Sequence, residues 1–285
     1  MQIGVLCSGG DAPGMNAAVL GTADTSEAEV VFIKNGYRGI YERTFAFPNA
    51  IEIEASQAGA AIGTARFDEF RQPKTRAEIA KILHEEGLDA LVVAGGNGSW
   101  EGARLLKAET GFPVIVVPAT IDNDFPNTDY TLGFDSALDC ISNAVDDLIL
   151  TARSHHRVFL LEVMGRKSFE LAESAAYANF SIPVLDESKD NLDRIAENVN
   201  KQGRSQILIV PEGLPDKQDA IEYLSEKIEL ETKYLNLSYL QRGAKPTTYD
   251  RLIGHRFGAE AISYLLANQD GYLGRKDGKI MLSNW

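Results

Sequence analysis

The chain has 285 residues, 44% hydrophobic and 24% charged, a composition that is ordinary for a globular protein with a large buried core. Its formal net charge of −13 at pH 7 argues against nonspecific binding to nucleic acid and against docking on anionic membranes. No apolar run approaches the length of a membrane span, and Cys7 and Cys140 lie far apart, so we expect a cytoplasmic protein without a disulfide framework.

The first predicted strand, at residues 2–7, runs into a glycine-rich loop at 8–14 and a helix that begins at about Met15. This order leaves backbone amides free beside a helix N-terminus, which favours anions, so it is typical of phosphate binding. No Gly-Lys-Ser/Thr follows, so the loop is not a Walker A motif. Because glycine-rich loops are often simple turns, this loop alone leaves both interpretations open.

The next segment carries weaker chemical signals. Its predicted elements are a strand at 29–33, a turn at 35–39 and a helix at 74–86. Between the turn and the helix, residues 58–71 are rich in glycine and alanine and end with Arg66, Phe67 and Arg71. Taken alone, these arginines indicate a solvated surface.

A second strand, glycine loop and helix follow. The strand is predicted at 90–94, the loop at 95–98 and the helix at 100–109, with Ser99 as its N-cap. Strands that alternate with helices predict a parallel sheet with right-handed crossovers.

An acidic loop, VPATIDND at 117–124, follows the next predicted strand. It brings Thr120, Asp122 and Asp124 to a strand's carboxyl end, where ligands bind in open α/β sheets. Two acids separated by one residue can have different catalytic roles, since one can accept a proton while the other holds a metal or orients water. The alternative is that these acids only form a turn or cap the next helix.

The second half of the chain again alternates between helices and strands. A long helix is predicted from Asp135 to about Ala152, and strands are predicted at 158–163, 181–185, 207–210 and 235–240. Glu212 follows one of these strands. His155 and His156 are adjacent and therefore unsuited to one metal ion, and the tail at 270–285 is poorly patterned.

The motifs, in chain order, are SGGDAPGMN, GTARFDEFR, GGNGS, PATIDND, SHHR, EVMGR, PEG and LQRG. Their order and spacing resemble the ATP-dependent 6-phosphofructokinases of the bacterial type, over about residues 3–266. The resemblance implies an α/β fold of two Rossmann-like three-layer lobes with mainly parallel sheets and the active site in the cleft between them. It further implies a nucleotide-binding lobe of residues 1–134 plus 243–285 and a sugar-phosphate-binding lobe of residues 135–242.

The resemblance also implies roles for individual residues. Those along the nucleotide would be Gly10, Tyr37, Arg66, Phe67, Asn97, Gly98, Ser99 and Gly102. Those around the sugar phosphate would be Thr120, Asp122, Asp124, Met164, Gly165, Arg166, Glu212, Tyr239 and Arg242. Asp122 would be the base, with Thr120, Asp124 and Arg166 completing the catalytic set. Arg157 and Lys233 would reach in from a neighbouring subunit, which implies a homo-oligomer, either dimer or tetramer.

The sequence departs from the family pattern at several of these positions. Asn97 replaces the aspartate that holds Mg²⁺, so metal binding should weaken, with Asp124 as a further ligand. Lys233 replaces an arginine, Tyr239 a histidine, and Phe169 a small residue, so that Phe169 is expected to crowd the sugar. Three positions where the family has effector-binding arginines hold other residues, namely Leu20, Asp24 and Ile149.

Three functions therefore remain open on the sequence alone. The leading one is Mg²⁺-dependent transfer of the γ-phosphate of ATP to the 1-hydroxyl of fructose 6-phosphate. The second is a regulatory paralogue that binds sugar phosphate or nucleotide without turnover, which the changes at Asn97, Lys233, Tyr239 and Phe169 favour. The third is an enzyme that uses pyrophosphate, but the small residues Gly98 and Ala119 leave room for a nucleoside and favour ATP.

Overall fold

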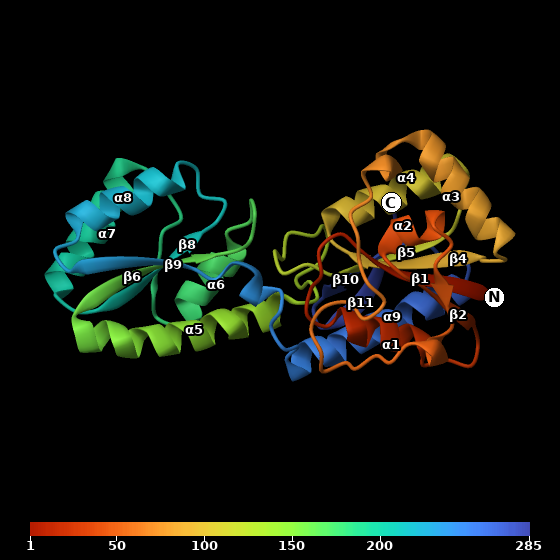
Figure 1. Cartoon of the computed structure of the whole chain (residues 1–285), viewed down its shortest axis with the longest axis horizontal. Coiled ribbons are helices and arrows are strands. Elements are labelled where there is room, and N and C mark those ends of the chain that lie inside the picture. The colour runs from red at the N-terminus through yellow and green to blue at the C-terminus, as the bar shows by residue number, and fades with distance from the viewer. The chain divides into compact units, whose positions relative to one another are not determined.

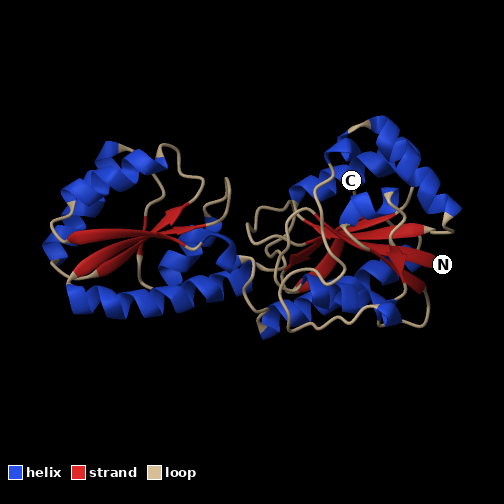
Figure 2. Cartoon of the chain, viewed as in Figure 1, coloured by secondary structure: helices blue, strands red, loops and turns tan.

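Two separate β-sheets, each covered by helices on both faces, make up the chain (Figure 1 and Figure 2). The computed structural model describes residues 1–285. It divides into unit 1, Met1–Ser136 with Arg242–Trp285, and unit 2, Ala137–Gln241. Mainly parallel sheets between helical layers confirm the predicted α/β fold class.

The sheet of unit 1 has seven strands in the order β11-β10-β5-β4-β1-β2-β3. The strands are β1 (Gln2–Ser8), β2 (Glu29–Ile33), β3 (Phe45–Ala46), β4 (Ala90–Gly95), β5 (Val114–Pro118), β10 (Gly271–Lys276) and β11 (Lys279–Ser283). Only the two edge strands, β3 and β11, pair antiparallel with their neighbours. The central strands read as apolar runs because helices cover both faces of the sheet.

The helices of unit 1 are α1 (Met15–Ala23), α2 (Gly36–Tyr41), α3 (Pro73–Glu85), α4 (Asn97–Thr110) and α9 (Thr248–Leu266). Short 3₁₀ helices lie at η1 (Pro48–Ala50) and η2 (Asp68–Arg71). Helices α1 and α9 cover one face of the sheet, and α2 to α4 cover the other (Figure 1). Glycines let α1 and α9 pack closely, since a Cβ at Gly21 would lie 2.1 Å from the His255 carbonyl oxygen.

Unit 2 has a four-stranded, all-parallel sheet in the order β7-β8-β6-β9. Its strands are β6 (Arg157–Val163), β7 (Ile182–Pro183), β8 (Gln206–Pro211) and β9 (Glu231–Asn236). Its helices are α5 (Phe134–His155), α6 (Glu170–Ala178), α7 (Lys189–Gln202) and α8 (Lys217–Lys227), with η3 (Ser238–Gln241) as a 3₁₀ helix. Helices α7 and α8 cover one face, and α5 and α6 the other (Figure 1).

Several predicted elements are wrong in detail. Residues 36–39 belong to helix α2, with Asn35 as its N-cap, rather than to a turn, and only two residues of the predicted strand 181–185 form β7. Strand β9 covers Glu231–Asn236 instead of 235–240, because it is a charged, largely exposed edge strand that an apolar pattern does not detect. The tail at 270–285, which is poorly patterned in the sequence, forms the β10–β11 hairpin around the turn residues Asp277 and Gly278.

A buried carboxylate anchors the long loop between β5 and α5. Asp250, in α9, is fully buried and accepts hydrogen bonds from the Tyr130 hydroxyl (2.5 Å) and the backbone amides of Gly133 (2.8 Å) and Ser136 (2.9 Å). Its burial raises its pKa, and the donors around it act in the opposite direction. The loop that carries the acidic residues is therefore fastened to α9.

The remaining sequence expectations concern cysteines and membrane spans. Cys7 and Cys140 are both free thiols, and burial raises the pKa of Cys7 to about 12, so this thiol stays protonated in the core. None of the helices has the length and apolar character needed to cross a membrane.

Candidate functional site

The two glycine loops and the acidic loop of unit 1 begin at the same edge of the sheet. Strand β4 lies between β1 and β5, and all three run parallel. Their last residues are paired in register, Ser8 with Gly95 and Gly95 with Pro118. Ligands of open α/β sheets bind at this carboxyl edge, so the topology gathers the predicted nucleotide-binding and catalytic loops.

The first glycine loop leads from β1 into α1 with left-handed backbone at Gly9 (φ 87°) and Gly14 (φ 88°). The Thr64 hydroxyl donates to the Gly9 carbonyl (3.0 Å) and so ties the segment before Arg66 to this loop. A Cβ at Gly10 would lie 2.9 Å from Nη1 of Arg242, so the Arg242 guanidinium lies against the loop. An arginine beside a glycine loop at a helix N-terminus is a setting that suits phosphate.

The second glycine loop is shorter than predicted, because α4 begins at Asn97 with Gly96 as its N-cap. The prediction that Ser99 caps this helix is wrong. The Ser99 hydroxyl instead donates to the Ser8 carbonyl (2.9 Å), which fastens the first turn of α4 to the end of β1. The Tyr37 hydroxyl in turn donates to the Ser99 carbonyl (3.1 Å).

The other predicted nucleotide residues lie around these loops in unit 1. Tyr37 is a core residue, stacked on Phe70 with ring centroids 3.9 Å apart, and burial raises its pKa. Gly102 faces this stack, since a Cβ there would lie 2.9 Å from the Phe70 ring. Phe67 is half-buried against the same core and Arg66 is exposed, so Arg66 is the cation of this set that solvent reaches.

The acidic loop is held by hydrogen bonds within unit 1. The Asp122 amide donates to the Thr120 hydroxyl (3.2 Å), and the Thr131 hydroxyl donates to the Thr120 carbonyl (2.6 Å). The Thr131 amide donates to Oδ1 of Asn123 (2.7 Å), whose backbone is left-handed (φ 48°). Asp122 is 4% exposed while Asp124 is exposed, so the two acids of this loop have different environments.

Asn97 and Asp124 are the two predicted metal-binding positions. They meet across the neighbouring loops after β4 and β5, where Nδ2 of Asn97 donates to the Asp124 carbonyl (3.4 Å). No group of three or more His, Cys, Asp or Glu side chains in the chain could hold a metal ion by itself. One carboxylate and one amide oxygen suit Mg²⁺, which usually binds one or two carboxylates together with substrate phosphates.

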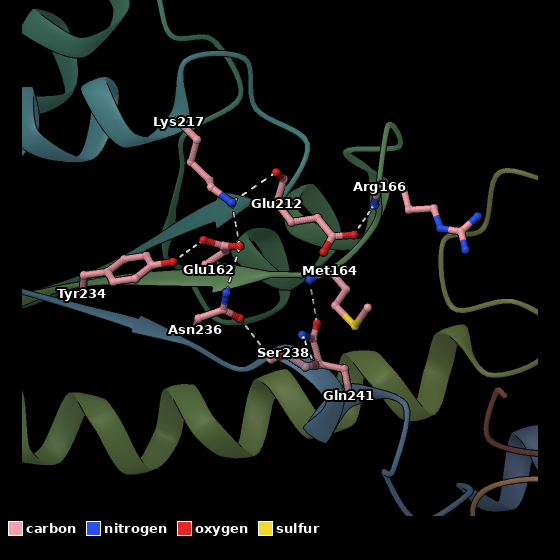
Figure 3. Close-up of polar contacts among 9 residues, drawn as sticks. All are labelled: Glu162, Met164, Arg166, Glu212, Lys217, Tyr234, Asn236, Ser238 and Gln241. Atoms are coloured by element: carbon pink, nitrogen blue, oxygen red, sulfur yellow. Dashed lines mark hydrogen bonds and ion pairs between the residues drawn. The ribbon is translucent and has the colours of Figure 1, made fainter. Parts of the chain in front are cut away.

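In unit 2, Met164, Arg166 and Glu212 lie at the carboxyl edge of the sheet (Figure 3). The Arg166 amide donates to Oε1 of Glu212 (2.8 Å), and the Glu212 amide donates to the Val163 carbonyl (2.8 Å). The turn requires Gly165, whose φ of 135° is disfavoured for other residues. These predicted sugar-phosphate residues are therefore brought together.

Arg157 and Lys233 do not join that group. Arg157 is the first residue of β6, about 23 Å along the strand from Met164 at 3.3 Å per residue. Arg157 and Lys233 both form ion pairs with Glu231, and hydrogen bonds from Lys233 and then Arg157 lower the pKa of this carboxyl. Tyr239 lies exposed in η3.

Phe169, expected to crowd the sugar, packs against the hydrophobic core of unit 2. Asp24, one of the three positions expected to lack an effector-binding arginine, lies beside His255, with its Oδ2 3.2 Å from Nε2.

Sequence reasoning missed four polar residues of unit 2 that support these loops, namely Glu162, Lys217, Asn236 and Gln241. Gln241 is fully buried, and its Oε1 accepts from the Met164 amide (3.1 Å). Glu162 could have been noticed in the sequence, since it is an acidic residue within the apolar strand β6. A carboxylate in that position needs hydrogen-bond donors from neighbouring elements.

The comparisons with known proteins agree on one family. A family model described as phosphofructokinase matches residues 2–265. A protein named ATP-dependent 6-phosphofructokinase from Haemophilus influenzae (strain 86-028NP) is 38% identical over 281 residues, which are 95% of this chain and 88% of that protein.

Two solved structures are similar over 99% of the chain. The phosphofructokinase from Saccharomyces cerevisiae has a TM-score of 0.89 at 30% identity, and the one from Pichia pastoris, in its T-state, has 0.88 at 29%. This chain spans 44% and 34% of the length of those two chains.

Gly213 offers a test of the loop packing in unit 2. A Cβ at this position would lie 1.6 Å from the Arg166 carbonyl oxygen, so Gly213→Ala should displace the turn and lower the free energy of unfolding by ~1–3 kcal/mol. The control is Gly98→Ala in α4, where a Cβ meets nothing within 4 Å. Urea denaturation measures both, and equal stability of the two variants would contradict the packing described here.

Proposed function

Because the chain belongs to the phosphofructokinase family, we propose that it is a kinase of glycolysis that transfers the γ-phosphate of ATP to the 1-hydroxyl of fructose 6-phosphate. The observation that carries this proposal is the gathering of two glycine loops and the Asp122 loop at one edge of the unit 1 sheet. The relative named ATP-dependent 6-phosphofructokinase, of which this chain covers 88%, supports ATP as the donor.

Unit 1 would bind the nucleotide. The backbone amides of the Gly10 loop and of the first turn of α4 would hold its phosphates, since both segments lie at helix N-termini, which favour anions and have no side-chain cap here. Arg66, which is exposed, would add a cation. Tyr37 and Ser99 would support the nucleotide site from behind, because the Tyr37 hydroxyl holds α2 against α4 and the Ser99 hydroxyl holds α4 against β1.

Unit 2 would bind the sugar phosphate through the group at the carboxyl edge of its sheet. Glu212 is a hydrogen-bond acceptor suited to sugar hydroxyls, and Arg166 is a fork-shaped donor suited to an oxyanion. Arg242, which lies against the Gly10 loop of unit 1, would supply a further cation.

Asp122 would carry the proton transfer. Its carboxylate takes the proton of the 1-hydroxyl as that oxygen attacks the γ-phosphorus, and the bond from the γ-phosphorus to the bridging oxygen of ADP breaks. Thr120 holds the loop backbone, so the base keeps a fixed position. Most of the remaining acceleration would come from positioning and from arginines that stabilise charge on the phosphoryl group.

Mg²⁺ would be the resident cation, held by Asn97 and Asp124 together with the nucleotide phosphates. It would supply charge neutralisation at the phosphate oxygens. The amide of Asn97 provides an oxygen without a charge, so the chain's own contribution to cation affinity is smaller than with two carboxylates.

Two alternative functions differ from this proposal. One uses another phosphoryl donor, and the other binds the ligands without turnover. A pyrophosphate-dependent enzyme would need the space beside Gly98 to be filled, but a Cβ there meets nothing within 4 Å, which leaves room for a nucleoside. A regulatory paralogue would bind the same ligands without turnover, and the two mutational tests below separate it from an enzyme.

We also propose a cytoplasmic homo-oligomer, dimer or tetramer, in which Arg157 and Lys233 serve a neighbouring subunit's site. The support is their position, since both lie away from the carboxyl edge that gathers Met164 and Glu212. Within one subunit they are paired with Glu231.

The first prediction concerns the base. Asp122→Ser should lower kcat by ~10² to 10⁴, while the dissociation constants of ATP and fructose 6-phosphate stay within a few-fold. The control is Asp129→Ser, an exposed acid of the same loop, which should leave kcat unchanged. Steady-state kinetics and calorimetric binding check both, and wild-type turnover in Asp122→Ser would remove the assignment.

The second prediction concerns the metal position. Asn97→Asp should lower the Mg²⁺ concentration that gives half the maximal rate, because the added charge acts on the cation. Asn198→Asp, an equal charge change on the exposed face of α7, should have no effect. If wild type and Asn97→Asp are both inert yet bind ligands, the chain is a regulatory paralogue.

The third prediction concerns assembly. Light scattering on the purified protein should give a dimer or tetramer, and Lys233→Ala should raise the KM for fructose 6-phosphate without changing that for ATP. A fully active monomer would contradict the shared site.

A further inference from the structure

Unit 2 contains a buried acid that the proposed chemistry does not use. Glu162 lies in β6 between Leu161 and Val163 and is 4% exposed. Its carboxylate accepts hydrogen bonds from Nζ of Lys217 (2.7 Å), from Nδ2 of Asn236 (3.0 Å) and from the Tyr234 hydroxyl (Figure 3). A buried carboxylate needs such donors, and the three come from two other elements, α8 and β9.

Two of these donors, Lys217 and Asn236, are also tied to loops at the carboxyl edge of the sheet. Lys217 donates a second hydrogen bond to the Glu212 carbonyl (3.3 Å). Oδ1 of Asn236 accepts from the Ser238 amide (2.7 Å), and the backbone carbonyl of Glu162 accepts from the Leu237 amide (3.1 Å). Glu162 therefore links the loop after β8 to the loop after β9.

Those two loops hold the proposed sugar-phosphate residues. Glu212 accepts from the Arg166 amide (2.8 Å). Gln241 accepts from the Met164 amide (3.1 Å) and donates to the Ser238 carbonyl (3.0 Å). The hydrogen bonds run without interruption from Glu162 to both sides of the Met164–Arg166 turn (Figure 3).

Lys217 lies at the N-terminus of α8, where the helix dipole disfavours a positive charge. It is the first residue of α8, and the positive end of the helix dipole lies there. Its ammonium is the single formal charge that faces the Glu162 carboxylate, since the other two donors are neutral. Burial and the hydrogen bond to Glu162 raise the pKa of Tyr234 to about 12, so its hydroxyl remains a donor at neutral pH.

We propose that the Glu162–Lys217 ion pair is the positioning element of the sugar-phosphate site. It acts through Glu212 and the Met164–Arg166 turn and does not touch the substrate. The inference rests on the proposed function, because it assigns these loops to the sugar phosphate. It predicts that breaking the pair affects fructose 6-phosphate selectively and leaves the nucleotide loops of unit 1 unaffected.

The test removes the cation. Lys217→Met should raise the KM for fructose 6-phosphate roughly 10-fold, because a displaced binding loop misplaces the substrate, while the KM for ATP stays within about two-fold. Lys217→Arg keeps the charge and should restore most of the affinity. Tyr234→Phe removes one neutral donor to the same carboxylate and should have a smaller effect in the same direction.

Lys201→Met, the same substitution at an exposed lysine of α7, is the matched control and should behave as wild type. Circular dichroism establishes that each variant is folded. If Lys217→Met lowers stability too far, the charge-neutral double variant Glu162→Gln/Lys217→Met is measured in its place, with the same expected loss of sugar-phosphate affinity.

A folded variant of the pair with an unchanged KM for fructose 6-phosphate, or with both KM values shifted equally, would overturn the proposal. Failure of the proposed function has a different result, namely a wild type that turns over no fructose 6-phosphate. In that case, amide hydrogen exchange in Lys217→Met tests the positioning role without relying on turnover. Faster exchange in Lys217→Met confined to residues 163–166 and 211–214 supports the positioning role, and unchanged exchange there removes it.

Discussion

Buried carboxylates that must be surrounded by donors determine how the functional loops of this protein are held. Asp250 in unit 1 and Glu162 in unit 2 are each less than 5% exposed. Neither can be left unsatisfied, because an unpaired buried charge costs several kcal/mol. Each therefore accepts hydrogen bonds from neighbouring segments: Asp250 from the loop before α5 and the first turn of α5, and Glu162 from α8 and β9.

This arrangement suits phosphoryl transfer. Such a reaction needs little covalent chemistry from the protein and depends on fixed charges and fixed distances. In unit 1 the Asp122 loop is braced by Thr131 and, through the following residues, by Asp250. In unit 2 the Met164–Arg166 turn is braced by Glu212 and Gln241. The loops that carry function are thus attached to buried polar groups rather than to the hydrophobic core alone.

The residues at which the sequence departs from the expected family pattern fit into this scaffold. Asn97 keeps its place at the start of α4 and its contact with the Asp124 carbonyl. Phe169 is partly buried and packs against the hydrophobic core of unit 2. Lys233 remains paired with Glu231 on the edge strand β9. The fold itself is shared with the similar solved structures.

The sequence by itself determined the alternation of strands and helices, the two glycine loops, the acidic loop and the family, because these depend on local periodicity and on contiguous motifs. Only the tertiary structure decided what Ser99 does, since its partner Ser8 is 91 residues away and is reached only when β1 and β4 pair in register. The same holds for Glu162, whose three donors lie more than 50 residues further along the chain. The charged strand β9 and the terminal hairpin were also beyond sequence reasoning, because edge strands are stabilised by pairing with a neighbour and need no apolar pattern of their own.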